Sequence, residues 1–459
     1  MIDLKKISNI WFIGIGGIGM SALARYFAEG GFEVAGYDRT ESSLTRELVS
    51  GGIKVIYSDD PEAIPGEYLN REKTLVIYTP AISPVNRIAA FFRTSGYSMH
   101  KRAEILGLVS RKGRTIAIAG THGKTSLTCM TAHLLKQSAI DCSAFLGGIS
   151  KNYRTNLLTG AGDIIVMEAD EFDRSFHHLN PGMALITSMD ADHLDIYGSY
   201  ENMVQAYREF TDKIKEGGKL LVNEKIAARL SGPQNVQLYT YGMKPPADFY
   251  AGEISLEKGV YRFNIHTPMG IIDDLSLLIP GKMNIENSVG AVALAKLAGA
   301  QDDEIRKALI YYRGVTRRFD VRISSDLLTY IDDYAHHPAE IDYCIESVRE
   351  FYGKKKICGI FQPHLFTRTR DHADAFAAAL DKLDRLFLLP VYPAREEEIK
   401  GVDSKMIFDR MKLQDKNLVG KDEVLEILGS AEIDVLLTMG AGDIDRLVEP
   451  IENMLRKRL

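Results

Sequence analysis

Cysteine is scarce in this sequence. The 459 residues include only four, Cys129, Cys142, Cys344 and Cys358, which are widely spaced and form no C-x-x-C pair. This spacing argues against a disulfide framework or a zinc knuckle and fits a reducing compartment. Long apolar runs are also lacking: none approaches the roughly eighteen residues of a membrane span, and the start, MIDLKKISNIWF, has no apolar signal region. We therefore expect a cytoplasmic protein with no membrane partner.

A strong excess of one charge sign is missing as well. Lys and Arg number 56 against 62 Asp and Glu, which gives a formal net charge of −6. This balance argues against a nucleic-acid partner but leaves room for local basic pockets that bind anionic substrates. Hydrophobic residues make up 45% and charged residues 26%, as is typical of a globular protein. Internal repeats and low-complexity tracts are not found.

Short β-rich runs alternate with amphipathic helical patterns, which indicates an α/β fold with parallel sheets. Apolar runs predict strands at residues 10–13, 32–37, 53–57, 75–78, 115–119, 163–167, 183–188, 327–331, 356–361, 386–390 and 435–439. Shorter, more polar strands between residues 220 and 278 predict a partly antiparallel extension. At about 150 residues per domain the length suggests three domains, which we place at residues 1–108, 109–313 and 314–459.

A glycine-rich loop follows the first predicted strand. In the segment IGIGGIG, Gly14, Gly16 and Gly19 fit the pattern G-x-G-x-x-G, and Asp38 follows about twenty residues later. The glycines allow the backbone to approach a pyrophosphate at the start of the next helix. Taken alone, this pattern suggests a nicotinamide-dependent dehydrogenase.

A second phosphate loop, GTHGKTS, covers Gly120 to Ser126 and follows the strand predicted at residues 115–119. Small residues let backbone N–H groups surround phosphate oxygens, and Lys124 can neutralise the β- and γ-phosphates. The hydroxyl of Thr125 can reach Mg²⁺. The spacing departs from G-x-x-x-x-G-K-[ST], because Ile118 stands where the first glycine is expected. We predict an ATP site that uses Mg²⁺.

Acidic residues follow two further predicted strands of this region. Glu168-Ala169-Asp170-Glu171 comes after one of them, and D-A-D-H-L-D, Asp190 to Asp195, comes after the other. Parallel strands place such residues at one edge of a sheet, where a metal-nucleotide complex binds. Oxygen ligands suit Mg²⁺, and the imidazole of His193 among them suggests a specific ligand. The alternative is a solvated acidic turn.

Taken together, these motifs resemble the Mur ligases. Further matching segments are Asn284 and Asn287, with Met283 where the family has histidine; Arg317-Arg318-Phe319; Asp332 to Pro338; Phe361 to His364; and Thr367 to Arg370. Pro338 also predicts the first turn of a helix. The resemblance implies three domains: an N-terminal Rossmann-like domain, a central domain like the P-loop ATPases with a mostly parallel sheet, and a C-terminal Rossmann-like domain.

The resemblance also implies an activity. A ligase of this kind uses ATP to join L-alanine to the lactyl carboxylate of UDP-N-acetylmuramate through an acyl phosphate, in peptidoglycan precursor synthesis. The first glycine loop would then bind the pyrophosphate of the UDP-sugar, and the protein would be a monomer or a weak homodimer.

The site residues that the resemblance implies fall into four groups. The UDP-sugar site would include Gly14, Gly16, Gly17, Ile18, Gly19, Asp38 and Thr79. The ATP site would include Gly120, Thr121, His122, Gly123, Lys124, Thr125, Ser126, Asn284, Asn287, Arg318 and Asp333. Thr125, Glu168 and His193 would bind metal, and Lys124, Glu168, His193 and Arg318 would be catalytic. The amino acid would contact Tyr334, His336, His364 and Arg368.

Several alternatives remain open at this point. A dehydrogenase would leave the second loop and its acidic edges without a role. A related ligase attaches a tripeptide to UDP-N-acetylmuramate, but its acidic segment lacks D-A-D-H-L-D. Leu365 and Ala335 stand where relatives commonly have arginine and glycine. The first difference affects how the amino acid is bound and therefore which amino acid is selected. We interpret His177 and His178 as ordinary surface or packing residues, since neighbouring side chains diverge on a strand or helix.

Overall fold

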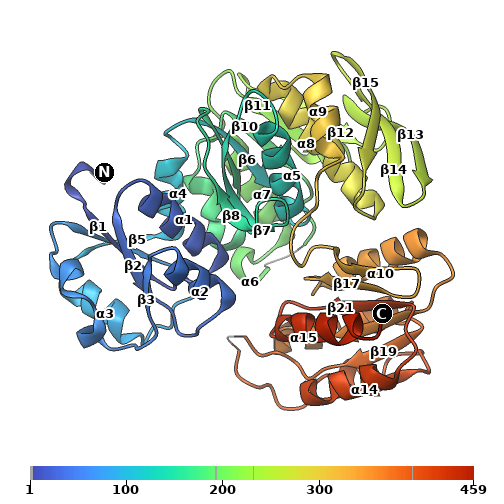
Figure 1. The fold of residues 1–459 in the computed structure, drawn as a ribbon. Coiled ribbons are helices and arrows are strands. Elements are labelled where there is room, and N and C mark those ends of the chain that lie inside the picture. Colours follow the sequence, from blue (N-terminus) through green and yellow to red (C-terminus); the bar gives the residue numbers. More distant parts are fainter. Residues whose placement is uncertain (1–3, 192–193, 231, 395) are drawn as a thin grey trace. The chain divides into compact units, whose positions relative to one another are not determined.

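A computed structural model describes residues 4–191, 194–230, 232–394 and 396–459 of the protein (Figure 1). Three sheets with flanking helices make a mixed α/β fold, as expected. The chain forms two compact units: Met1–Ser255 with Arg262–Ser276 and Glu286–Tyr312, and Leu256–Tyr261 with Leu277–Ile285 and Arg313–Leu459. None of the helices in the described part of the chain combines the length and apolar character that crossing a bilayer requires.

The first sheet is parallel throughout, with the strand order β3-β2-β1-β4-β5. Its central strand, β1, reads NIWFI and is buried along its whole length, because neighbouring strands and helices cover it on both sides. Strands β2 and β3 lie on one side of β1, and β4 and β5 lie on the other, so the strand order reverses at β1. Open α/β sheets bind ligands at such a reversal. The elements are β1 (Asn9–Ile13), α1 (Ile18–Glu29), β2 (Glu33–Tyr37), α2 (Ser43–Ser50), β3 (Lys54–Ile56), β4 (Thr74–Tyr78), α3 (Arg87–Thr94), β5 (Ser98–Lys101) and α4 (Arg102–Val109).

The second sheet has ten strands in the order β15-β14-β13-β12-β11-β10-β6-β9-β7-β8. Its central strand β6 (Arg114–Ala119) pairs in parallel with β9 (Ile164–Glu168) and β10 (Met183–Ile186), so the second phosphate loop and the first acidic segment leave the same edge. The remaining strands are β7 (Ser143–Ser150), β8 (Thr155–Leu158), β11 (Lys219–Asn223), β12 (Gln237–Gly242), β13 (Phe249–Glu257), β14 (Val260–Thr267) and β15 (Gly270–Leu277). The helices are α5 (Lys124–Lys136), α6 (Leu194–Tyr197), α7 (Tyr200–Thr211), α8 (Lys282–Ala298) and α9 (Asp302–Leu309).

The third sheet has the order β16-β17-β21-β18-β19-β20, and only the edge pair β16–β17 is antiparallel. Helix α10 begins at Pro338, as the sequence predicts, because proline needs no hydrogen-bond acceptor in a first turn. The strands are β16 (Asp320–Ser324), β17 (Thr329–Asp333), β18 (Ile357–Phe361), β19 (Arg385–Leu388), β20 (Lys416–Leu418) and β21 (Val435–Met439). The helices are α10 (Pro338–Tyr352), α11 (Phe366–Asp371), α12 (Ala373–Leu380), α13 (Lys405–Phe408), α14 (Val424–Ser430) and α15 (Asp445–Arg456).

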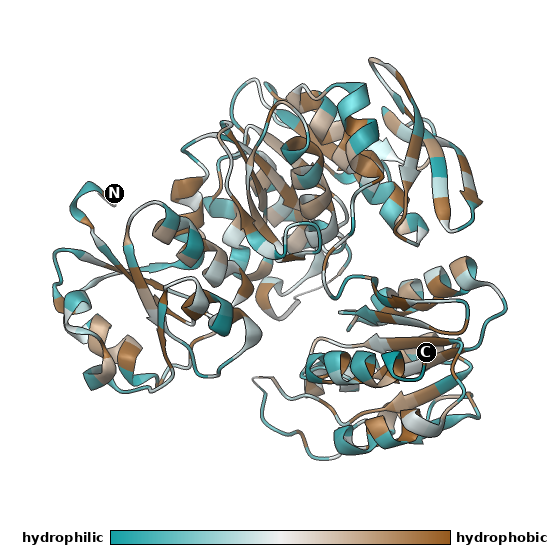
Figure 2. Cartoon of the chain, viewed as in Figure 1, coloured by the Kyte–Doolittle hydropathy of each residue, from teal (hydrophilic) through white to brown (hydrophobic). Residues whose placement is uncertain are grey.

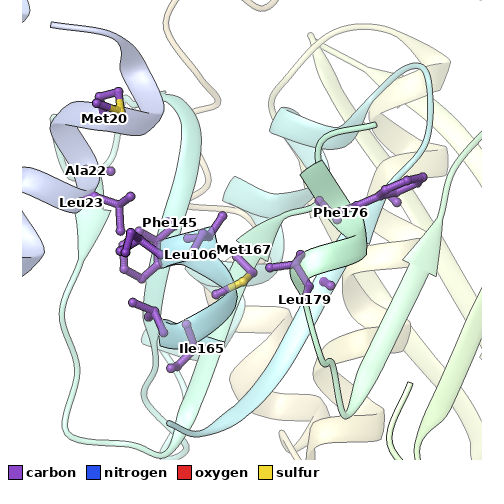
Figure 3. Packing of buried hydrophobic residues seen from close by; sticks show 14 of the residues in the cluster. Met20, Ala22, Leu23, Leu106, Phe145, Ile165, Met167, Phe176 and Leu179 are labelled. Carbon is purple, nitrogen blue, oxygen red and sulfur yellow. The ribbon is translucent and has the colours of Figure 1, made fainter. Parts of the chain in front are cut away.

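One apolar cluster joins the first two sheets. Figure 3 shows Met20, Ala22 and Leu23 of α1 together with Phe145 of β7 and residues of β9. Each large side chain buried in this way stabilises the fold by about 1.5–3 kcal/mol. Polar contacts add to the packing, since Nδ2 of the fully buried Asn156 in β8 donates to the Ile18 carbonyl at 2.6 Å and to Ser21 Oγ at 2.8 Å. The helix after the first glycine loop is therefore anchored on the second sheet.

Hydropathy follows the same architecture. In Figure 2 the strands are largely apolar, whereas the helices carry hydrophilic residues along part of their surface. This is the pattern of sheets that are covered by helices, in which only one face of each helix is buried.

Candidate active site

The first glycine loop connects β1 to α1 and is closed by two residues from neighbouring strands. Gly14 has φ +85°, and a Cβ atom there would lie 2.6 Å from Thr79 Cγ2, so only glycine fits without a shift. The N–H of Gly16 donates to Asp38 Oδ2 at 2.8 Å. Thr79 and Asp38 thus both contact the first glycine loop, which is the arrangement expected if they contribute to one binding site with it. Asp38 holds the loop backbone here, and its contact with a ribose stays a prediction.

The N-terminus of α1 faces this loop without a capping group. Gly17 is its N-cap residue, its first turn holds no acidic residue, and no side chain of the described residues caps it. Unpaired N–H groups and the helix dipole at such an end favour a bound anion. This geometry suits a pyrophosphate. It does not distinguish a pyrophosphate that carries a nicotinamide nucleoside from one that carries uridine.

The second phosphate loop follows β6 and is tied to the residues after β10. Gly120 and Gly123 have φ values of +129° and +79°, which favour glycine. Ser188 fixes the loop, since its carbonyl accepts from Thr121 N at 3.1 Å and its Oγ accepts from His122 N at 3.0 Å. The imidazole of His122 lies 3.5 Å from Asp190 Oδ2. Contacts within the protein therefore define the shape of the loop.

Lys124 is the central cation of this loop. Its Nζ donates to the Gly120 carbonyl at 2.5 Å and to Glu171 Oε1 at 2.8 Å. Burial by itself would lower the pKa of Lys124, but the carboxylates of Glu171, Glu168 and Asp170 outweigh it and raise that pKa above its ordinary value. The lysine is consequently charged at neutral pH, as phosphate binding requires.

Glu168 ends β9 beside the second phosphate loop, and β6 pairs with it at Ile118. Its carboxylate lies directly against Gly147 of β7, where a Cβ atom would overlap Oε2. Thr125 is buried in the first turn of α5. A hydroxyl and a carboxylate are oxygen ligands that suit Mg²⁺, so these residues fit the ion as a partial donor set. His193, the third predicted ligand, lies outside the described residues. Within those residues no cluster of three or more His, Cys, Asp or Glu could hold a metal.

Helix α8 carries the two predicted asparagines one turn apart. Asn287 is buried, and its Oδ1 lies 3.1 Å from the position of a Cβ atom on Gly123, so it contacts the second phosphate loop. Its buried Nδ2 has no hydrogen-bond partner among the described residues. Asn284 instead donates through Nδ2 to the Pro280 carbonyl at 2.6 Å.

In the second unit, the predicted ATP residues Arg318 and Asp333 lie next to the turn after β17. Asp333 accepts from Phe319 N at 2.6 Å and from Ala335 N at 2.7 Å. Loss of hydration raises the pKa of Asp333 to about 6, although the charge of Arg318 opposes this. The guanidinium of Arg318 lies 4.8 Å from the ring centre of Tyr334. Its neighbour Arg317 pairs with buried Asp332 at 3.1 Å and is therefore structural.

The residues predicted to bind the amino acid are brought together in this unit. The ring centres of His336 and Tyr334 are 5.2 Å apart, and those of His336 and His364 are 5.9 Å apart. Burial lowers the pKa of His336 to about 4, and the charge of Arg368 adds to this, so Arg368 faces the same group. Leu365 has φ +71°, an uncommon value for a residue with a side chain. Such strain is often found in ligand-binding segments.

Several residues of these sites escaped the sequence analysis. Tyr392 stacks on His364 with ring centres 5.9 Å apart and an interplanar angle of 22°. Ser188 and Glu171 fix the second phosphate loop and its lysine, and Arg102 lies against Gly19. Only Glu171 had a sequence signal, because it belongs to the acidic segment after β9.

His177 packs against its neighbours, whereas His178 is exposed. The ring of His177 lies 4.6 Å from that of Phe176, and its Nε2 is 3.8 Å from Glu209 Oε2. Burial lowers the pKa of His177. The backbone of His178 lies against Gly107 of α4, where a Cβ atom would be 2.5 Å from its carbonyl oxygen.

Three family models match the chain in order. They are described as Mur ligase family, catalytic domain, at residues 9–114; Mur ligase middle domain at residues 118–295; and Mur ligase, glutamate ligase domain, at residues 317–442. A relative from Parabacteroides distasonis, named UDP-N-acetylmuramate–L-alanine ligase, is 47% identical over 459 residues, which cover 100% of this chain and 99% of the relative.

Solved structures show the same likeness. The UDP-N-acetylmuramate-alanine ligase of Thermotoga maritima has a TM-score of 0.83 at 27% identity and covers 98% of this chain and 100% of its own. A murein peptide ligase from Psychrobacter arcticus has a TM-score of 0.70 at 18% identity, with 98% of each chain covered. The second likeness is one of fold alone.

Proposed function

Because the chain belongs to the Mur ligase family, we propose that it is the ATP-dependent ligase that joins L-alanine to UDP-N-acetylmuramate in peptidoglycan precursor synthesis. The observation that carries the proposal is that the full-length identity to a ligase of this name coincides with two phosphate loops in one unit. A dehydrogenase would need only the first loop. The same identity favours L-alanine over a tripeptide as the amine substrate.

The first step joins two anions, the lactyl carboxylate of the sugar and the γ-phosphate of ATP, and gives an acyl phosphate and ADP. Positioning and charge neutralisation carry most of the catalysis in such a step. Lys124, held in its charged form by the surrounding carboxylates, supplies the positive charge next to the transferring phosphoryl group. Backbone N–H groups of the second loop and the first turn of α5 bind the phosphate oxygens.

Thr125 and Glu168 would hold Mg²⁺, with His193 proposed as a ligand of a second ion. Bound Mg²⁺ supplies charge neutralisation at the phosphates. Asn287 supports the loop from α8 and offers its unpaired amide to the nucleotide.

In the second step the amine of L-alanine attacks the acyl carbon, and phosphate leaves from a tetrahedral intermediate. Arg368 and His364 would bind the alanine carboxylate, because a guanidinium fork matches a carboxylate in shape and charge. His336 is neutral at pH 7 since its pKa is lowered to about 4, which makes it a weak base. It is therefore better suited to orient the amine, together with Tyr334, than to take its proton.

Use of ATP and a nucleotide sugar places the proposed reaction in the cytoplasm. The test is phosphate release by the purified protein with Mg·ATP and UDP-N-acetylmuramate, measured with L-alanine, glycine, L-serine or an L-Ala-γ-D-Glu-containing tripeptide. Release with L-alanine, matched by a mass gain of one alanyl group on the nucleotide sugar, is the expected result. Release with the tripeptide alone would assign the protein to the related peptide ligase, and no release with any amine would refute the ligase proposal.

A further inference from the structure

Arg102, the first residue of α4, lies against the first glycine loop. A Cβ atom on Gly19 would be 2.6 Å from Arg102 Nη1, 3.2 Å from its Cδ and 3.3 Å from its Cζ. The guanidinium therefore covers the first turn of α1 in the space that a side chain on Gly19 would fill. In this chain a side chain at the third glycine of the pattern would displace the guanidinium of an arginine from a distant segment.

The same guanidinium reaches the acidic segment after β9. Its Nη2 lies 3.3 Å from Asp170 Oδ2, and 22% of the arginine side chain and 36% of the aspartate side chain are exposed. A second pair, Lys101 Nζ with Asp173 Oδ2 at 2.9 Å, joins the same two segments. Arg102 thus contacts the first phosphate loop and the acidic edge of the second at once.

We propose that Arg102 is an anion-binding residue of the first glycine loop, whose guanidinium contacts the diphosphate of the UDP-sugar while Asp170 positions it. The inference rests on the proposed function, which puts that diphosphate at the N-terminus of α1. The uncapped helix end offers N–H groups but no charged side chain in its first turn. Arg102 supplies the missing full positive charge, in a planar fork that matches phosphate oxygens.

The ion pair with Asp170 holds the guanidinium in one direction. A single exposed ion pair would contribute little stability, but here it orients a long side chain and lowers the entropy lost on binding. Asp170 is also the neighbour of Glu171, which holds Lys124. One side chain, Arg102, therefore lies against both the first glycine loop and the acidic segment that follows β9.

The experiment is calorimetric titration of the full-length protein with UDP-N-acetylmuramate and, separately, with a non-hydrolysable ATP analogue. The variants are Arg102→Ala, Arg102→Lys, Asp170→Asn and the double variant Arg102→Ala with Asp170→Asn. Lys101→Ala is the matched control, since it removes the parallel pair to Asp173, whereas the three atoms nearest to a Cβ atom on Gly19 all belong to Arg102. Thermal unfolding establishes that each variant is folded.

Arg102→Ala should weaken UDP-N-acetylmuramate binding by about tenfold or more, as expected for the loss of a charge-assisted hydrogen bond. Arg102→Lys should fall between it and the wild type. Lys101→Ala should bind the sugar nucleotide normally, and all of these variants should bind the ATP analogue normally. Asp170→Asn should weaken sugar-nucleotide binding in the wild-type background and have no further effect in the Arg102→Ala background, as expected when Asp170 acts through Arg102.

Wild-type affinity for the sugar nucleotide in a folded Arg102→Ala protein would overturn the inference and leave the proposed function intact. Should Arg102→Ala fail to fold, Arg102→Lys decides, because unchanged affinity there would equally overturn a role for the guanidinium fork. Failure of the wild-type protein itself to bind UDP-N-acetylmuramate would instead refute the proposed function and the inference together.

Discussion

The Nζ atom of Lys124 lies 2.8 Å from Glu171 Oε1, and only 2% of the Glu171 side chain is exposed. The cation of the second phosphate loop is thus paired with a buried carboxylate. The other oxygen, Oε2, has no hydrogen-bond partner among the described residues. The carboxylate of Glu171 therefore interacts mainly with Lys124 and holds the lysine side chain at the proposed phosphate site.

Glu171→Gln should destabilise the protein by about 3 kcal/mol, because it removes the carboxylate that is paired directly with the buried ammonium of Lys124. The midpoint of thermal unfolding measures this. A non-hydrolysable ATP analogue should restore part of the loss, since its phosphates replace the missing negative charge. Asp163→Asn is the control: it removes an exposed pair with Arg114 and should leave the midpoint nearly unchanged. Equal midpoints for both variants would show that the Lys124 pair is not stabilising.

Gly147→Ala should raise the Mg²⁺ concentration needed for half-maximal phosphate release by about tenfold, as is usual when the support of a metal ligand is disturbed. The added Cβ atom would overlap Glu168 Oε2 and push the proposed ligand aside. Gly66→Ala is the matched control, because nothing lies within 4 Å of its added Cβ atom. A normal Mg²⁺ requirement in Gly147→Ala would count against Glu168 as a ligand.

His336 should make the second unit sensitive to acid. Its pKa is lowered from 6.5 to about 4 in the folded protein, so the unfolded chain binds a proton first as the pH falls. The associated stability is fully present above pH 6.5 and is lost as the pH falls towards 4, at about 1.4 kcal/mol per pKa unit and roughly 3 kcal/mol in total. His336→Gln should flatten unfolding profiles recorded in this window.

Asp333 should change the pH dependence of stability in the direction opposite to that of His336. Its pKa is raised from 3.8 to about 6, so its contribution to stability is fully present below pH 3.8 and is lost as the pH rises through 6. Asp333→Asn should remove that loss and make stability rise more steeply with pH than in the wild type. Identical pH profiles for the His336 and Asp333 variants would refute this assignment of the two groups.

Tyr392→Leu should raise the KM for L-alanine by about twofold to tenfold, which corresponds to the 0.5–1.5 kcal/mol of an aromatic contact. The tyrosine ring stacks on His364 and orients it towards the proposed alanine site. Tyr392→Phe keeps the ring and is expected to behave like the wild type, and the KM for ATP should not change in either variant. An unchanged KM for L-alanine in Tyr392→Leu would exclude this orienting role.

Much of the site was readable from the sequence because its chemistry is local. Phosphate binding needs glycines and a lysine directly after a strand, so Gly120, Gly123 and Lys124 form a pattern within a few residues. The central strands were equally visible, since burial on both faces makes them continuous apolar runs. Five strands were missed: β5, β7, β8, β16 and β20. Gly147-Gly148 interrupt the apolar pattern of β7, and the other four strands have only three to five residues.

The sequence by itself determined the fold class, the two phosphate loops and the acidic segments, because backbone spacing and burial impose short-range patterns. Only the tertiary structure decided which side chains meet. Arg102 contacts Gly19, which is 83 residues away in the sequence, and Asp170, which is 68 residues away. Tyr392, which follows β19, contacts His364, which follows β18. Such contacts follow from the order of strands within a sheet and, for Arg102 with Asp170, from the packing of the first two sheets. Neither leaves a periodic pattern in the sequence of the segments involved.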